Sequence, residues 1–441
     1  MAALAVLELA DLLPHILCHL QLGALRVRLV CKDFLAVVSG MRLTVMALSG
    51  ANVSGQLARG TVSSSGGVLQ KVMPPDGGAI NVVGCGFYHT CVLAADGTLW
   101  VCGRNNDGQL GLGHDQLRVA RLHRMPLPQG VAVRLIACGQ AHTCIVTRTG
   151  ELWGCGSNEH GQLGLGDGVA RCTTLQPAVR TSEDGAPVEH AACGQHHTVV
   201  SSTQGDLWAC GNGLVGQLGY GWLDLSAKQL ERVDMHQILE EGEMPQGISW
   251  HVACGKANTF VLSPQGLLWA CGWNNCGQCG VGHRANVLQL ERVSLPCFPC
   301  AITQVDAGAV HTCLVVNQGG GGSGLWACGY NGHGQRGNAD PATWLIPQPF
   351  PGLSSVQVAS VTCGYEHTCI LTADGSLFTC GRNNVGQCAN GSTKLREFNL
   401  HRIELPPIHN GAAGKQPSAF CTRVVCGNGG NGGHTVVLYS Q

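Results

Sequence analysis

Short apolar runs alternate with glycine-centred turns over most of the chain, and Cys85–Gly113 shows the pattern most clearly. Its His-Thr-Cys-Val-Leu run is followed by Asp96-Gly97, a two-residue signal for a tight turn between antiparallel strands. The run Leu99–Cys102 then returns, and a Gly-Gln-Leu-Gly step turns the chain again. A further apolar segment, such as Val131–Ala137, precedes each Cys-Gly step. The pattern predicts units of three or four short antiparallel strands.

The unit recurs at intervals of roughly 50–60 residues, so the repeat sets the architecture. Two marker steps count the units, and each occurs seven times. The Gly-Gln step occurs at Gln56, Gln109, Gln162, Gln217, Gln278, Gln335 and Gln387. The glycine of the Cys-Gly step, which reads Ala-Gly once, occurs at Gly86, Gly139, Gly194, Gly255, Gly308, Gly364 and Gly427. The count predicts seven small sheets, each a blade of a β-propeller or its offset equivalent.

The two marker series are out of phase at the ends of the chain. The repeat region begins with the Gly-Gln half of a unit, Ser49–Gly60, and ends with the Cys-Gly half of a unit, Cys426–Leu438. We expect the C-terminal strands to pair with the N-terminal ones and to complete one blade. Circular closure of this kind hides most of the sheet edges that would otherwise invite unwanted pairing.

Residues 1–45 carry few glycines and have a different periodicity. One apolar set recurs at three- and four-residue steps and comprises Leu9, Leu12, Leu13, Ile16, Leu17 and Leu20. A second set comprises Leu25, Leu29, Val30, Phe34 and Leu35. The pattern predicts two short helices, with Gly40 as the stop. Two such helices cannot bury these leucines alone, so they need a partner surface.

Composition narrows the class of protein. The formal net charge is −1, which gives the molecule no electrostatic bias toward nucleic acid or an anionic membrane. No window approaches the about 18 apolar residues of a membrane span. The N-terminal apolar run lacks a basic start and is broken by Glu8 and Asp11, so a secretory signal is not expected. We therefore expect the 25 cysteines to be reduced core residues of a cytoplasmic or nuclear protein.

Three sets of side chains suggest chemistry at first sight. Histidines recur at His89, His142, His197, His311, His367 and His434, with Asn258 in the equivalent place of the fourth unit. We expect them to make structural hydrogen bonds, because an asparagine can replace a histidine in such a bond. Large aromatic residues recur at Trp100, Trp153, Trp208, Trp269, Trp326 and Phe378, and we expect them to anchor the core between blades.

The third set has the spacing of a zinc site, C-x2-C-x17-C-x2-C, at Cys276, Cys279, Cys297 and Cys300. Cys276 and Cys279 occupy ordinary repeat positions that need no metal, so no metal site is predicted. The chain also has no nucleophile elbow and no phosphate-binding loop. We predict no catalytic residue and no cofactor.

Two insertions interrupt the regular repeat: a glycine run, Gln318–Ser323, in the hairpin turn of the fifth unit, and a longer segment that is a candidate partner-binding loop. The segment Gly221–Trp250 lengthens the connection between the third and fourth units. Loops on a rigid scaffold are frequent binding sites, although an acidic loop can also be merely solvated. Its acidic residues are Asp224, Glu231, Asp234, Glu240, Glu241 and Glu243.

The repeats resemble the regulator of chromosome condensation repeat over about residues 46–441. The motifs that carry the resemblance are CG..HT, DG.L[WF].CG and N..GQLG. It implies an all-β, seven-bladed propeller. The family includes a Ran exchange factor, a plant ultraviolet-B photoreceptor and recognition modules of ubiquitin ligases. Photoreception by that mechanism needs tryptophan just after the Cys-Gly step, where this chain has Phe87, Gln140, Gln195, Lys256, Ala309, Tyr365 and Asn428.

Residues 1–45 resemble an F-box, on the LL…IL..L spacing of the first predicted helix and the VCKDF motif at Val30–Phe34. The resemblance implies docking to the adaptor subunit of a cullin-RING ubiquitin ligase. A helical cap over one end of the propeller is the alternative. The residues implied in adaptor binding are Leu12, Leu13, Ile16, Leu17, Leu20, Leu29, Val30 and Phe34.

Two functional hypotheses follow. In the first, the propeller is a non-catalytic substrate-recognition subunit of a ubiquitin ligase and binds an unidentified protein through its loops. In the second, it is a guanine-nucleotide exchange factor for a Ran-like GTPase, a role that needs no catalytic side chain. A general binding scaffold is the remaining possibility.

Overall fold

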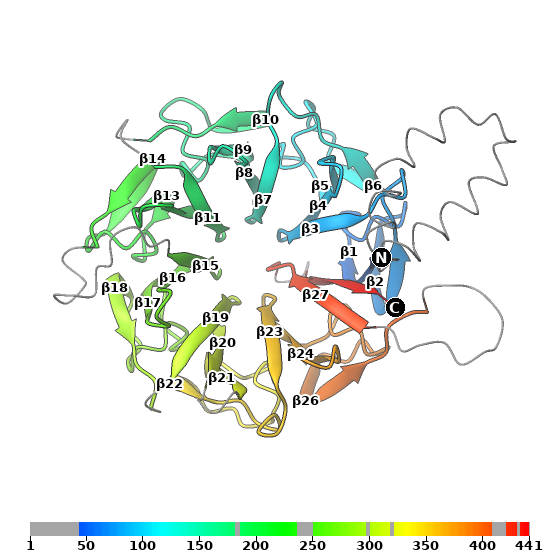
Figure 1. Cartoon of the computed structure of the whole chain (residues 1–441), viewed down its shortest axis with the longest axis vertical. Helices are drawn as coiled ribbons and strands as arrows, with labels where there is room; N and C mark the ends of the chain where they lie inside the picture. The colour runs from blue at the N-terminus through cyan, green and yellow to red at the C-terminus, as the bar shows by residue number, and fades with distance from the viewer. Residues whose placement is uncertain are drawn as a thin grey trace, which may run out of the picture.

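The computed structural model describes residues 44–180, 186–235, 250–296, 300–317, 322–407, 420–429 and 433–440. These residues form 28 strands and no helix. The strands make seven four-stranded antiparallel sheets, arranged as blades around a central axis (Figure 1). The predicted all-β, seven-bladed propeller is confirmed. Residues 1–43 lie outside the described residues, and so do the predicted helices and adaptor-binding side chains of the F-box-like segment.

Six blades follow the chain, with the first strand of each nearest the axis and the fourth at the rim (Figure 1). Blade 1 consists of β3 (Ile80–Cys85), β4 (His89–Ala94), β5 (Leu99–Arg104) and β6 (Arg118–Arg124). Blade 2 consists of β7 (Val133–Cys138), β8 (His142–Thr147), β9 (Leu152–Ser157) and β10 (Arg171–Pro177). Blade 3 consists of β11 (Val188–Cys193), β12 (His197–Ser202), β13 (Leu207–Gly213) and β14 (Asp224–Val233).

Blade 4 consists of β15 (His251–Cys254), β16 (Asn258–Leu262), β17 (Leu268–Gly272) and β18 (Val287–Val293). Blade 5 consists of β19 (Ala301–Ala307), β20 (His311–Asn317), β21 (Ser323–Gly329) and β22 (Trp344–Pro349). Blade 6 consists of β23 (Val358–Cys363), β24 (His367–Thr372), β25 (Leu377–Arg382) and β26 (Arg396–Ile403). The remaining four strands form the seventh blade.

Blade 7 joins the two ends of the repeat region. From axis to rim its order is β27 (Phe420–Cys426), β28 (His434–Ser440), β1 (Val45–Asn52) and β2 (Ser63–Val72). Strand β28 pairs with β1 in antiparallel register, from Val45 opposite Tyr439 to Gly50 opposite His434. The blue and red strands stand side by side in Figure 1. The predicted closure by two half-blades is confirmed, and β1 begins at Val45, one residue before the predicted domain start.

The second strand of each blade carries the most continuous apolar run, and its burial explains why. In β4 every residue from His89 to Ala94 is buried, and the same holds for β8, β12, β16, β24 and β28. Such a strand has a neighbouring strand on each edge and a neighbouring blade on each face, so neither side can be polar. The rim strand β18 instead mixes buried and exposed residues, with only Val287, Leu290 and Val293 buried.

The turn after the second strand differs from the sequence prediction. The amide of Gly97 donates to the carbonyl of Ala94 at 3.0 Å, and the amide of Ala94 donates to the carbonyl of Thr98 at 2.9 Å. The loop therefore contains three residues, and Gly97 takes φ +88°. This is the hairpin that places glycine at the left-handed position after a tight turn, so Asp-Gly marked the turn but not its length.

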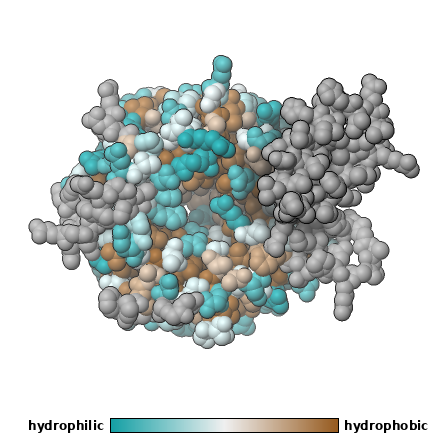
Figure 2. Space-filling model, viewed as in Figure 1, coloured by the Kyte–Doolittle hydropathy of each residue, from teal (hydrophilic) through white to brown (hydrophobic). Residues whose placement is uncertain are grey.

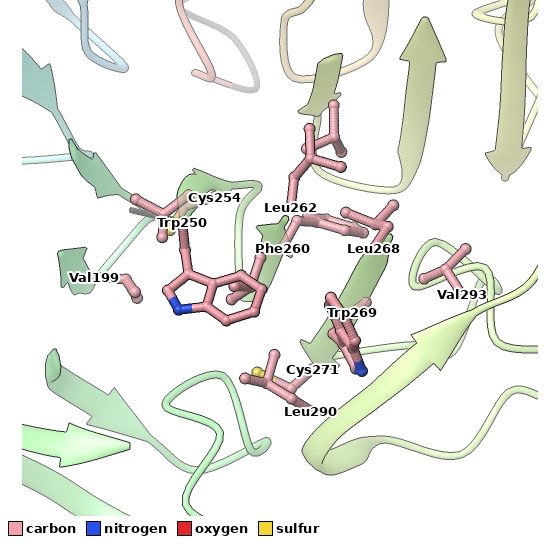
Figure 3. Packing of buried hydrophobic residues seen from close by; sticks show 14 of the residues in the cluster. Val199, Trp250, Cys254, Phe260, Leu262, Leu268, Trp269, Cys271, Leu290 and Val293 are labelled. Atoms are coloured by element: carbon pink, nitrogen blue, oxygen red, sulfur yellow. The ribbon is translucent and has the colours of Figure 1, made fainter. Parts of the chain in front are cut away.

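The largest apolar cluster spans blades 3, 4 and 5 (Figure 3). Trp250 and Trp269 meet edge to face with ring centroids 5.7 Å apart, and Phe260 packs beside them with no exposed surface. The indole nitrogen of Trp250 donates to the carbonyl of Gly205 at 2.8 Å, so this residue buries its ring without leaving its N–H unpaired.

The insertion after the third unit is not one loop, as the sequence analysis had supposed. Asp224–Val233 forms the rim strand β14, so Asp224 and Glu231 lie in a strand and Asp234 follows it directly. A rim strand faces solvent and can be rich in charge, which hid its strand character. Glu240, Glu241 and Glu243 lie outside the described residues. A partner-binding role for the six acidic residues stays a prediction.

Candidate functional site

The candidate site is built by the tight turn that joins the first and second strands of each blade. In blade 1 the amide of Gly86 donates to the carbonyl of His89 at 2.9 Å and closes the turn. A Cβ atom on Gly86 would collide with the imidazole of His89, so only glycine fits there. The next residue, Phe87, donates its amide to the carbonyl of Gly139 in blade 2 at 3.3 Å. The turns of blades 1 to 5 are each tied to the following blade by a bond of this kind near the axis.

We call the residue directly after this glycine the axial slot, and the end of the propeller that carries these turns the axial face. Backbone bonds between slots continue around the axis, as from Gln195 to Lys256 at 2.8 Å and from Ala309 to Tyr365 at 2.9 Å. The flanking Cys-Gly and His-Thr positions are nearly uniform, whereas the slots vary. They are Phe87, Gln140, Gln195, Lys256, Ala309, Tyr365 and Asn428.

An open pocket of about 340 Å³ lies among these slots and is here called the axial pocket. Figure 2 shows one face of the molecule, with the ring axis as a hollow bordered by both hydrophilic and apolar residues. The pocket combines aromatic, amide and cationic side chains contributed by five blades. Its lining residues are Phe87, Tyr88, Gln140, Gln195, Lys256, Tyr365 and Arg382.

Aromatic rings hold the central cation of the pocket. The Lys256 ammonium lies 5.4 Å from the ring centroid of Trp273 and 5.7 Å from that of Tyr365. Tyr365 meets Phe87 edge to face at 6.2 Å. Burial, the neighbouring His160 and then Lys256 lower the pKa of His196 to about 4, so this imidazole adds no charge at neutral pH.

A second pocket of about 370 Å³ adjoins the first and is here called the side pocket. Tyr88 lines both pockets, and the Arg104 guanidinium lies over its ring at 5.6 Å. The other residues of the side pocket are Val53, Ser54, Asn106, Leu117 and Arg118.

The repeated histidines form a chain of structural bonds between blades. The Thr143 hydroxyl donates to the carbonyl of Gln109 at 2.7 Å, so it can only accept from Nε2 of His89, 2.9 Å away. This fixes the Nε2–H tautomer of His89. Equivalent pairs are His142–Thr198, His197–Thr259, His311–Thr368, His367–Thr435 and His434–Thr90. The predicted structural role of the histidines is confirmed.

Burial keeps these imidazoles neutral. Desolvation is the largest cause that lowers the pKa of His89, His142, His197 and His311 to about 3. The junction between blades 4 and 5 lacks the bond, because neither side-chain polar atom of Asn258 has a hydrogen-bond partner. The expectation that asparagine replaces histidine in the bond is wrong, since its shorter side chain leaves Thr312 bonded to the carbonyl of Gln278 alone.

The predicted aromatic anchors fall into two groups. Trp208, Trp269 and Trp326 are almost fully buried, as expected. Trp100, Trp153 and Phe378 occupy the same place in blades 1, 2 and 6 but stay half-exposed while packing against the core clusters. The core role therefore holds fully for the first three and in part for the others.

Sequence reasoning missed four clusters of one histidine and two cysteines between blades, with ligating atoms within 4.8 Å of one another. They were hidden because each combines a His-Thr-Cys run with the Cys-Gly step of the next blade. In the first cluster Nε2 of His89 donates to Thr143, while Nδ1 of the same ring has no hydrogen-bond partner. The clusters are His89/Cys91/Cys138, His142/Cys144/Cys193, His311/Cys313/Cys363 and His367/Cys369/Cys426.

The cysteines with zinc-like spacing behave differently. Cys279 is fully buried and its thiol contacts the carbonyl of Trp273 at 3.5 Å, whereas Cys276 is half-exposed. Cys297 lies outside the described residues. All 22 described cysteines are free thiols. The part of the chain that the structure describes contains no helix long and apolar enough to cross a membrane.

A ring of blades with a variable axial face is typical of a β-propeller that serves as a binding scaffold. The chain belongs to the RCC1-like domain family, whose pattern matches residues 45–429.

Known relatives agree with this assignment. The ultraviolet-B receptor UVR8 of Arabidopsis thaliana is 30% identical over 383 residues, covering 83% of this chain and 81% of the receptor. The secretion-regulating guanine nucleotide exchange factor of Bos taurus is 29% identical over 390 residues, covering 73% of this chain and 82% of that protein.

Solved structures show the same fold. The yeast RCC1 protein Prp20, crystallised with Kap60, superposes with a TM-score of 0.75 at 19% identity, covering 91% of this chain and 90% of that chain. Human WBSCR16 superposes with a TM-score of 0.73 at 21% identity, covering 91% of this chain and all of that chain.

Proposed function

We propose that this chain is a non-catalytic recognition propeller that binds a protein substrate through its axial face. The observation that carries the proposal is the contrast within the repeat. The framework positions are nearly uniform in all units, whereas the seven slots hold six different residue types and five of the slots line one open pocket. A rigid scaffold that presents variable side chains at one place is suited to holding a partner.

We propose further that residues 1–45 recruit the adaptor subunit of a cullin-RING ubiquitin ligase, so that the propeller selects the protein to be modified in the cytoplasm or nucleus. The F-box-like LL…IL..L spacing and the Val30–Phe34 motif support this assignment. One relative is itself named as a ubiquitin ligase, which favours the pathway but not the adaptor contact. The probable E3 ubiquitin-protein ligase HERC3 of Homo sapiens is 33% identical over 208 residues, covering 46% of this chain and 18% of that protein.

The test compares three full-length chains expressed in cells: wild type, Leu13→Asp/Leu17→Asp, and Lys256→Glu. We expect adaptor and cullin subunits to copurify with wild type and with Lys256→Glu, and to be lost from the double variant, because charge on the predicted helix face prevents apolar docking. Absence of the adaptor from wild-type complexes, or its retention by the double variant, would refute the ubiquitin-ligase role.

Exchange of guanine nucleotide on a small GTPase is the second candidate, favoured by the similarity to the Bos taurus exchange factor. An exchange factor stabilises the nucleotide-free GTPase and needs no reactive side chain. A fluorescent-nucleotide release assay with Ran and related GTPases tests it. Acceleration by wild type and its loss in Lys256→Glu would support exchange through the axial face. Unchanged release rates with every GTPase would exclude this role.

A further inference from the structure

We propose that the axial and side pockets form one continuous groove that binds an extended acidic segment of a partner protein. The inference rests on the proposed recognition function and names the chemistry of its partner. Tyr88 lines both pockets, so a chain lying across this residue can occupy both. Together the two pockets offer about 340 and 370 Å³, which is room for several side chains.

The charge of the groove favours an acidic occupant. Four cations line it, namely Lys256, Arg382, Arg104 and Arg118, and no carboxylate is among the described lining residues. The whole chain has a formal net charge of −1, so the excess of positive charge is local to the groove. Clefts of one sign raise the local concentration of ligands of the opposite sign.

The cations are held in different ways. Arg382 forms an ion pair with Glu366 at 2.8 Å and is partly neutralised. Lys256 and Arg104 instead rest against aromatic rings, which fix the cations in place without neutralising their charge. These positions can accept carboxylates of a ligand while the rings exclude water from one side.

The groove also presents apolar and hydrogen-bonding surface. Leu117 is 67% exposed at the side pocket and can contact an apolar or aromatic side chain of the ligand. In the axial pocket, the buried Oε1 atom of Gln140 has no hydrogen-bond partner. Rotation of the Gln140 amide toward the pocket would let this acceptor receive a peptide N–H and remove its desolvation cost.

These features suit a peptide better than a nucleic acid. A single strand of nucleic acid needs a basic track along its backbone and open aromatic faces on which bases stack. Here Arg382, one of the four cations, is already paired with Glu366, and the ring of Phe87 is only 5% exposed. An extended peptide with a few spaced carboxylates needs fewer cations than the backbone of a nucleic acid does.

The experiment presents a library of short peptides from disordered protein segments to the full-length chain. Wild type, Lys256→Glu, Lys256→Arg and Arg148→Glu serve as bait. Arg148 is exposed in the turn after β8, at the end of the blade opposite the axial face, and its substitution makes the same change in charge. Thermal unfolding verifies that each variant is folded.

We expect wild type to enrich acidic peptides that contain an aromatic or large apolar residue. Affinity for the best synthetic peptide should fall about tenfold or more in Lys256→Glu, stay near wild type in Arg148→Glu and decrease with salt. Enrichment of neutral or basic peptides, or equal binding by Lys256→Glu, would overturn the proposal. Tighter binding of a single-stranded oligonucleotide, lost in the same variant, would overturn it in favour of nucleic acid.

The Leu13→Asp/Leu17→Asp chain separates this inference from the ubiquitin-ligase role. It should bind the acidic peptide as wild type does. Peptide binding without adaptor recruitment would leave the groove assigned and the ligase role refuted. Adaptor recruitment without acidic-peptide binding would do the reverse.

Discussion

Acidification should destabilise the propeller strongly, because its interblade histidines are held neutral. Burial lowers the pKa of His89, His142, His197 and His311 to about 3, whereas in the unfolded chain each has its ordinary value of about 6.5. Between these values the unfolded chain binds protons that the folded ring does not. The stability from these residues is therefore fully present above pH 6.5 and is lost as the pH falls toward 3.

The magnitude follows from the difference in proton binding. A pH of 5 lies about 1.5 units below the pKa of each histidine in the unfolded chain. Protonation of that histidine therefore favours unfolding by about 2 kcal/mol. The four together give about 8 kcal/mol. Asp306 acts in the opposite direction, because burial raises the pKa of its carboxyl group to about 6. It gains a proton in the folded state over this interval and restores about 1 kcal/mol.

The net loss from these five groups, about 7 kcal/mol, is comparable with the total stability of an ordinary domain. We expect the urea concentration at half-unfolding to fall sharply between pH 7 and pH 5, as followed by tryptophan fluorescence. His142→Asn is the matched control, because asparagine already occupies the equivalent position at Asn258. The variant should lose about 2 kcal/mol less than wild type over the same interval. Equal midpoints at pH 7 and pH 5, or an unchanged pH dependence in the variant, would refute the reasoning.

Three further substitutions test the framework by urea unfolding at neutral pH. Asn258→His should create the missing bond to Thr312 and add about 0.5–1.5 kcal/mol, and a loss of stability would show that the junction cannot accept the ring. Trp269→Ala should cost about 3–5 kcal/mol, since the ring is buried in the cluster of blades 3 to 5, and a cost below about 1 kcal/mol would contradict that packing. Gly194→Ala places a methyl group against the ring of His197 and should cost about 1–3 kcal/mol, while an unchanged midpoint would mean that the turn relaxes freely.

The blades could be predicted from the sequence because their signals are local and recur. A His-Thr-Cys-Val-Leu run is typical of a buried strand, and the phase of the two marker series predicts closure by two half-blades. The sequence pattern did not predict elements whose conformation depends on tertiary contacts. Asp224–Val233 reads as an acidic loop because a rim strand needs no apolar run, and β14 is a strand because it pairs with β13.

The candidate site was only partly visible in the sequence. The axial slots were identified, but only to test them for tryptophan. That Lys256 from blade 4 reaches Tyr365 from blade 6 depends on how closely the blades approach at the axis, which spacing along the chain does not encode. The missing bond at Asn258 likewise depends on the reach of one side chain toward Thr312.

Pairing of β1 with β28 determines when the edge of β1 can be covered during translation. Val45 meets Tyr439, so the first strand to leave the ribosome has no neighbour on one edge until nearly 400 residues later. At about 5–20 residues per second, that edge stays open for about 20–80 s. A nascent chain of six finished blades still exposes β1, and chaperones that shield such edges should act on this protein until β28 has been made.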